Sequence, residues 1–165
     1  MNAINAGRRF EFRNTSQLAI PIPSSLPRPT PSELRGAFPW IKEIECDSSP
    51  TSAGMFQLGT ASTLFEGDDD LIGCEEFERR VSQDRHKLLG YQQGIWIVKH
   101  QDEFPEMEKL QGKVNILLPG LIVVDNSKDR RMFFLGSGGR GWWLSWRILN
   151  HRMGFTPRDL IAFSG

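Results

Sequence analysis

Runs of bulky apolar residues, separated by short polar or glycine-rich stretches, fill the chain from residue 95 to residue 149. The runs read IWIVKH, VNILLPG, LIVVD, RRMFFL and GWWLSWRIL. β-Branched and aromatic residues favour strands, and short connections favour antiparallel pairing of consecutive strands. Pro119 and Gly120, between two of the runs, mark a turn or a β-bulge. The pattern predicts an antiparallel β-meander in the C-terminal half, in which IWIVKH is a strand.

A helical period replaces this pattern between residues 70 and 84. Apolar side chains fall on one helical face, namely those of Leu71, Cys74, Phe77 and Val81. Three acids precede them and offer N-caps and favourable charge for a helix start: Asp68, Asp69 and Asp70. The segment therefore predicts the main helix of the protein, over about 70–84.

The last residues resemble a helix start. Thr156, Pro157 and Asp159 stand where an N-cap, a proline in the first helical position and a first-turn acid would stand. We therefore expect a short C-terminal helix. Together with a short strand around residues 40–46, these elements predict an α+β fold.

The N-terminal segment has a different composition. Five prolines occur between residues 17 and 32 and remove backbone donors. Residues 1–35 are therefore predicted to form an extended, proline-rich arm, and residues 36–165 a single α+β domain. The arm could grip a partner through four apolar side chains, those of Leu18, Ile20, Ile22 and Leu26. A plain linker is the alternative. If the arm binds a partner, deletion of residues 1–35 should abolish partner capture and leave the fold intact.

Length and composition bound the function. The chain has 165 residues, of which 39% are hydrophobic and 24% charged, so it is expected to form one globular domain. It contains no apolar run near the ~20 residues of a membrane span and no secretory signal, so we expect a cytoplasmic protein that does not contact membranes. Two cysteines cannot build a disulfide framework or a four-thiolate zinc site.

Charge is distributed unevenly although the formal net charge is zero. Residues 1–35 carry a net charge of +3, residues 36–127 carry −8 and residues 128–165 carry +5. Such asymmetry indicates partner binding at the ends or the middle, or neutralisation of basic segments by acidic ones within the fold. If the acidic middle binds a protein partner, Asp68, Asp69 and Asp70 would contact that partner.

No residue pattern points to catalysis, a metal or a cofactor. His86, His100 and His151 lack metal-ligand spacing, and a cysteine–histidine pair has no recognisable catalytic setting. The Asp triplet lacks the alternating ligands of a calcium loop. The glycine-rich loop 136–141 lies between two predicted strands, which favours a turn over a phosphate loop.

That loop also supports a nucleic-acid hypothesis. Arginines could bind phosphates there, and tryptophans could stack on bases. The candidate residues are Arg130, Arg131, Arg140, Trp142 and Arg147. A tryptophan-rich strand is more commonly part of a core, so this interpretation stands second.

Two motifs resemble the YwqG-like family, bacterial domains of unknown function. The first is HKLLGYQQGI, with matches at His86, Lys87, Gly90, Tyr91 and Ile95; the second is GSGGRGWWLSW, with matches at Gly136, Gly138, Gly139, Trp143 and Trp146. Leu89, Gln92, Trp96 and Ser137 depart from the family pattern. The resemblance covers residues 84–147, and a weaker one links the glycine-rich strand to SUKH-type immunity proteins. Both resemblances imply a protein binder or toxin-neutralising protein without catalytic residues.

The sequence therefore favours a non-catalytic protein–protein interaction protein, either an immunity-type protein that binds a toxin or an assembly subunit of a larger complex. The alternative is a nucleic-acid-binding subunit of a ribonucleoprotein or defence complex that uses the basic, aromatic C-terminal segment.

Overall fold

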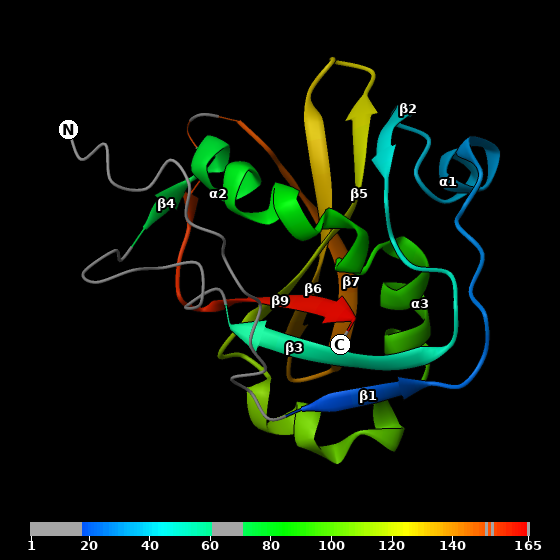
Figure 1. The fold of residues 1–165 in the computed structure, drawn as a ribbon, viewed down its shortest axis with the longest axis vertical. Helices are drawn as coiled ribbons and strands as arrows, with labels where there is room; N and C mark the ends of the chain where they lie inside the picture. The colour runs from blue at the N-terminus through cyan, green and yellow to red at the C-terminus, as the bar shows by residue number, and fades with distance from the viewer. Residues whose placement is uncertain (1–17, 61–70, 151, 153, 165) are drawn as a thin grey trace.

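A curved, mixed β-sheet separates two layers of helices in the computed structural model (Figure 1). The structure describes residues 18–60, 71–150, 152 and 154–164. The sheet has the strand order β1-β3-β9-β5-β6-β7, and β2 pairs with β5 beside this path. These strands are β1 (Ala19–Ile22), β2 (Ile41–Asp47), β3 (Gly54–Thr60), β5 (Asn115–Asp125), β6 (Arg130–Gly138), β7 (Gly141–Ile148) and β9 (Asp159–Ser164). The predicted α+β class is confirmed.

The helices and a small second sheet lie between these strands in the sequence. The helices are α1 (Pro31–Ala37), α2 (Cys74–Val81) and α3 (Tyr91–Lys99), and the 3₁₀-helices are η3 (Ser82–Lys87), η4 (Gln101–Glu103) and η5 (Pro105–Leu110). The second sheet joins β4 (Ile72–Gly73) to β8 (Gly154–Phe155). None of the helices among the described residues has the length and hydropathy that crossing a membrane requires.

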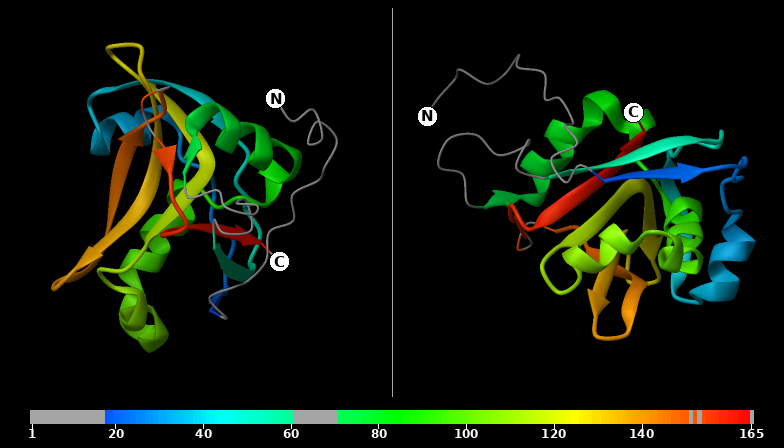
Figure 2. Two further views of the ribbon diagram at one scale, coloured as in Figure 1. Left: turned by 90° about the vertical axis from the view of Figure 1, so that its left-hand side faces the viewer. Right: turned by 90° about the horizontal axis from the view of Figure 1, so that it is seen from below.

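Two hydrophobic cores fill the faces of the main sheet. One core joins α1 and α3 to the sheet through residues such as Leu34, Ile97 and Phe133. The other core joins α2 to the opposite face through Phe77, whose ring stacks on Phe155 with centroids 3.9 Å apart. Figure 2 shows α2 and α3 on opposite sides of the strands.

Strand β5 pairs with different strands along its length, and its pairing with β6 contains an irregularity. Its register with β6 shifts between Leu118 and Ile122, at Pro119 and Gly120. Before the shift β5 lies parallel to β9, and after it β5 pairs antiparallel with β2. The proline–glycine pair is therefore a bulge within one strand, which is one of the two predicted alternatives.

The arm prediction is wrong for the described residues 18–35. Strand β1 pairs antiparallel with β3, and the side chains of Leu18, Ile20 and Ile22 are buried in the first core. Pro21 fits because β1 is an edge strand, where a missing N–H need not break the sheet. Helix α1 is the next element along the chain, and Thr30 and Glu33 form its capping box. Residues 1–17 of the predicted arm lie outside the described residues.

Two other segments form a different type of secondary structure from the one predicted. The run IWIVKH lies in α3, because a short apolar run fits a buried helix as well as a strand. The predicted C-terminal helix is strand β9, which pairs with β3 and β5. The N-cap pattern forms a turn instead, in which the Thr156 N–H donates to Asp159 Oδ2 over 2.9 Å.

The main helix is shorter than predicted. Helix α2 begins at Cys74, with Gly73 at the N-cap and no side-chain cap, and continues as the 3₁₀-helix η3. Asp68, Asp69 and Asp70, which were predicted to cap it, lie outside the described residues. Strands β5, β6 and β7 are consecutive antiparallel neighbours, but the parallel pairing of β9 with β5 makes the C-terminal half more than a meander.

Candidate functional site

The main sheet has three strands with an unpaired side, and they differ in how that side is protected. Strand β1 carries Pro21, and β2 has register irregularities and lies beside α1. Strand β7 pairs with β6 in continuous register from Gly141 to Ile148, and it lies at the outer edge in the left view of Figure 2. Prolines and bulges prevent edge-to-edge association. Of these edges, β7 is the regular one.

One end of this edge is closed by the side chain of Gln101. The Trp142 N–H donates to Gln101 Oε1 over 2.8 Å, and Gln101 Nε2 donates to the Trp142 carbonyl over 3.1 Å. A Cβ at Gly141 would lie 2.5 Å from Gln101 Oε1, so a side chain there would displace the amide. Gln101 thus occupies the position that a neighbouring strand would take.

The backbone groups further along β7 remain open. Alternate residues of a strand point their N–H and C=O groups to the same side, so those of Leu144, Trp146 and Ile148 point away from β6, as those of Trp142 do. Within the described part of the chain, no group hydrogen-bonds to these outward groups. Five residues, 144–148, therefore present an unpaired strand edge.

Exposed tryptophans flank the edge on both faces. Trp146 is 37% exposed, and its ring lies 5.1 Å from that of Trp40 and 5.4 Å from that of Phe38. Trp143 is 48% exposed on the other face, where it packs over Gly136 and Gly138. Exposed aromatic side chains beside open backbone groups are typical of protein-binding surfaces.

The residues predicted to bind nucleic acid are mostly engaged within the fold. Arg130 forms ion pairs with Glu45 and Glu78, and Arg131 forms one with Asp125. The remaining three candidates differ. Trp142 is buried and donates to the Met107 carbonyl, Arg147 lies over the Phe155 ring, and Arg140 is exposed on the β6–β7 turn.

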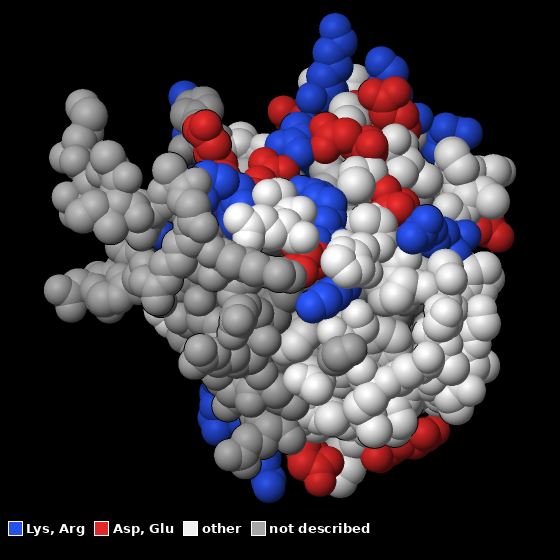
Figure 3. All heavy atoms as spheres, in the orientation of Figure 1, with Lys and Arg blue, Asp and Glu red and all other residues white. Residues whose placement is uncertain are grey.

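Several of these ion pairs join a basic end of the chain to its acidic middle. The arginines come from residues 1–35 or 128–165, and their partners Glu45, Asp47, Glu78 and Asp125 from residues 36–127. Figure 3 shows side chains of both signs interspersed over the upper part of one face. These pairs favour the internal-neutralisation alternative.

The predicted partner-binding residues are not a surface patch. Leu18, Ile20 and Ile22 have exposures of 7%, 0% and 2%, so they cannot grip a partner in the folded protein. Leu26 is half-buried against the first core. Alternation in β1 explains the error, since every second residue of the segment points inward. The three candidate aspartates, Asp68 to Asp70, lie outside the described residues.

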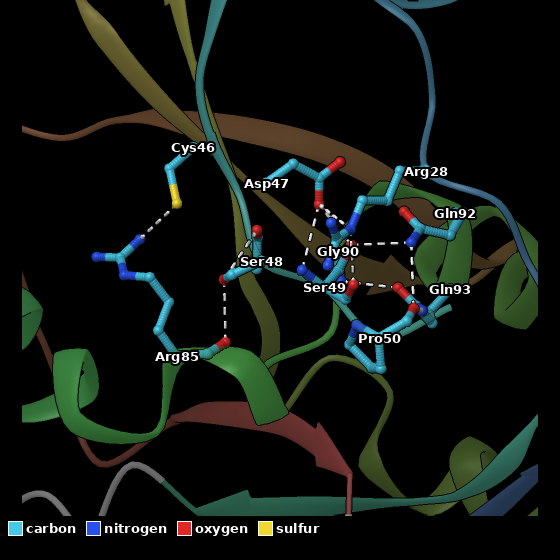
Figure 4. A network of polar contacts seen from close by, with 11 residues as sticks. Arg28, Cys46, Asp47, Ser48, Ser49, Pro50, Arg85, Gly90, Gln92 and Gln93 are labelled. Carbon is cyan, nitrogen blue, oxygen red and sulfur yellow. Dashed lines mark hydrogen bonds and ion pairs between the residues drawn. The ribbon is translucent and has the colours of Figure 1, made fainter. Parts of the chain in front are cut away.

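A buried polar network ties the segment after β2 to the start of α3 (Figure 4). Ser49 is fully buried; its Oγ donates to Asp47 Oδ1 over 2.6 Å and accepts from Gln92 Nε2 over 2.8 Å. Gln93 Nε2 donates to the Pro50 carbonyl, and its Oε1 accepts from the Gly90 N–H. A Cβ at Gly90 would lie 2.8 Å from that of Ser49, so glycine is needed for this approach.

This network is structural. Arg28 Nε donates to the Ser49 carbonyl over 2.9 Å, which ties the proline-rich segment to the same cluster. Ser49 has no solvent access, so it cannot act as a nucleophile toward a substrate. Sequence reasoning missed the network, because residues more than 40 positions apart meet in it.

The described cysteines are free thiols, and one of them is buried. Burial raises the pKa of the Cys74 thiol, with the nearby Glu78 carboxylate acting in the same direction, which disfavours a thiolate. Cys46 and Cys74 are both free thiols. Among the described residues, no three His, Cys, Asp or Glu side chains lie close enough to hold a metal ion.

Comparisons of the chain with protein-family models, curated proteins and solved structures yield no match. The resemblance to the YwqG-like family stays a prediction. Its glycines Gly136 and Gly138 lie beneath the Trp143 ring in this fold, and Gly90 precedes α3.

Proposed function

We propose that the protein is a non-catalytic interaction protein that binds an extended segment of another protein along β7. The observation that carries this proposal is the open edge at residues 144–148, with Trp143 and Trp146 beside it. An extended peptide can add a strand to such an edge, so that backbone hydrogen bonds supply affinity and side-chain contacts supply specificity. An assembly subunit or an immunity-type protein would hold its partner in this way.

The length of the edge favours a peptide segment over a second copy of the chain. A standard protein interface buries roughly 800 Å² on each partner and involves about 20–30 residues a side. The open part of β7 has five residues and ends at the Gln101 side chain, so it supplies a small part of such an interface. A short strand from another protein matches this length.

The faces of β7 define the chemistry of the segment. On the face of Leu144 and Trp146, an added strand would meet the aromatic rings of Phe38 and Trp40. The side chains of that strand that point to this face should therefore be apolar. Every second residue of the segment points the same way, so the proposed motif is apolar at alternate positions.

Selection of phage-displayed random dodecapeptides against the full chain tests the proposal. We expect selected peptides to show apolar residues at alternate positions. On binding, the amide protons of Leu144, Trp146 and Ile148 should gain protection from hydrogen exchange in NMR spectra. Those of Trp143 and Ser145, which face β6, should be protected with or without the peptide.

Two variants complete the experiment. Trp146→Ala should weaken peptide binding about tenfold, because it removes an aromatic contact at the edge. Met55→Ala, at a side chain that is 54% exposed on β3, serves as the control and should bind normally. Unchanged exchange at β7, or equal affinity of both variants, would reject strand addition. Single-strand DNA competing for the edge would instead support the nucleic-acid alternative.

A further inference from the structure

A polar cavity of about 360 Å³ lies where β5 and β9 begin, and Arg147 of β7 contributes to its lining. Its lining includes Lys113, Asn115, Arg147, Thr156, Arg158 and Asp159. They come from the start of β5 and the loop before it, from β7, and from the start of β9 and the turn before it. Three of these six are cationic, and one is a carboxylate.

The carboxylate is already occupied by protein donors. Asp159 is buried; its Oδ1 accepts from Asn115 Nδ2 over 3.2 Å, and its Oδ2 accepts from the Thr156 N–H over 2.9 Å. Its ion pair with Arg147 Nη1 is long, at 3.9 Å. One carboxylate can neutralise one of the three cations, so the cavity retains an excess of positive charge.

Arg147 is held in place but not fully satisfied. Its Nη2 donates to the Gly154 carbonyl over 2.8 Å, and its guanidinium lies 4.4 Å from the centre of the Phe155 ring. Its Nε is buried and lacks a hydrogen-bond partner. A buried N–H without an acceptor is unfavourable, so the protein alone leaves part of the hydrogen-bonding capacity of this guanidinium unused.

Arg158 is also positioned by the backbone. Its Nε donates to the Lys113 carbonyl over 2.9 Å and its Nη2 to the Gly112 carbonyl over 3.4 Å. A guanidinium has five N–H donors, so these contacts fix its plane and leave others available. The exposed Lys113 adds an ammonium group at the same cavity.

We propose that this cavity binds the phosphate group of a small molecule. Two arginines held by backbone carbonyls and one lysine supply N–H donors and positive charge, the combination that recognises phosphate oxygens. The volume lies at the low end of small-molecule sites and exceeds what one phosphate needs, which leaves room for part of an ester. The site does not depend on strand addition at β7.

Isothermal titration of the full chain with inorganic phosphate tests the proposal, with sodium chloride used to keep ionic strength constant. We expect saturable binding of one phosphate per chain. Lys113→Ala and Arg158→Ala should each weaken it about tenfold, and Arg158→Lys should weaken it less than Arg158→Ala. The controls are Lys99→Ala and Arg140→Ala, exposed residues that do not line this cavity, and they should bind as the unmodified chain does.

Titrations with ribose 5-phosphate and O-phosphoserine distinguish the sources of the phosphate. Tighter binding of one ester than of inorganic phosphate would identify the ester as ligand, and binding of inorganic phosphate alone would identify the free ion. Circular dichroism of each variant establishes that it is folded. Heats equal to those of a sodium chloride titration, or full binding by folded Lys113→Ala and Arg158→Ala variants, would overturn the proposal.

Discussion

Asp125 organises the turn between β5 and β6. Its Oδ1 accepts from the N–H groups of Ser127 and Asp129, and its Oδ2 accepts from Arg131 Nε over 2.7 Å. Burial raises the pKa of this carboxyl, but these hydrogen bonds and the Arg131 charge outweigh burial, so the net pKa lies below its ordinary value. The folded state therefore favours the carboxylate.

We predict that Asp125→Asn lowers the free energy of unfolding by about 1–3 kcal/mol at pH 7. Because the folded pKa is depressed, the carboxylate stabilises the fold above about pH 4 and loses this effect as the pH falls through the folded pKa. The difference between variant and unmodified protein should shrink below that pH. Urea unfolding at several pH values measures this difference in the free energy of unfolding. Asp102→Asn, at an exposed side chain, is the control. A difference that does not vary with pH would contradict the prediction.

Individual residues were predictable where neighbours in sequence decide their role. The exposure of Arg140 on a turn follows from the glycines around it. The role of Ser49 does not, because its partner Gln92 is 43 positions away. Gln101 likewise reaches Trp142 across 41 positions, so no local pattern marks it as the residue that closes the β7 edge.

At the scale of elements, Arg130 connects α2 to the sheet. From β6 it donates to both carboxylate oxygens of Glu45 on β2 and to both of Glu78 on α2, over 2.6–2.8 Å. These hydrogen bonds raise the pKa of Arg130 and so favour its charged form. A planar guanidinium can serve two carboxylates at once, and an ammonium cannot do so with the same geometry.

Arg130→Lys should therefore lower the free energy of unfolding by about 1 kcal/mol, a modest value because the side chains are partly exposed. Urea unfolding at low and high salt measures it, and the loss should be smaller at high salt. The exposed Arg152 provides the control substitution Arg152→Lys. A stability equal to that of the unmodified chain, combined with weaker binding to nucleic acid, would instead favour the hypothesis that Arg130 contacts phosphates.

Helices and strands were predicted correctly where the spacing of the apolar residues and the length of the run indicated the same type of element. The strands β5, β6 and β7 combine apolar, β-branched or aromatic runs with short connections, and both features favour antiparallel strands. The run in α3 is too short for its period to separate helix from strand. The predicted C-terminal helix failed because β9 lies between β3 and β5, where strand pairing outweighs a local cap pattern.

At the scale of the whole molecule, the N-terminal segment is part of the sheet. We predict that a chain lacking residues 1–35 fails to fold stably, since it loses β1 and the buried side chains of Leu18, Ile20, Ile22 and Leu34. Ile20→Ala alone should lower the free energy of unfolding by about 2–5 kcal/mol. Thermal unfolding followed by circular dichroism measures both, with Pro21→Ala, at an exposed neighbour, as control. A truncated chain with an unchanged melting temperature would restore the arm hypothesis.

Local period and propensity were enough to predict the α+β class, the antiparallel strands β5, β6 and β7, and a helix within residues 70–84, of which Cys74–Val81 form α2. The three-dimensional fold was needed to show that the proline-rich segment completes the sheet, that most of the candidate arginines are paired within the chain, and that the described residues leave one edge of β7 open. Each of these depends on which distant segments become neighbours. Which distant segments become neighbours depends on burial and strand pairing over the whole chain, so a local sequence pattern cannot predict it.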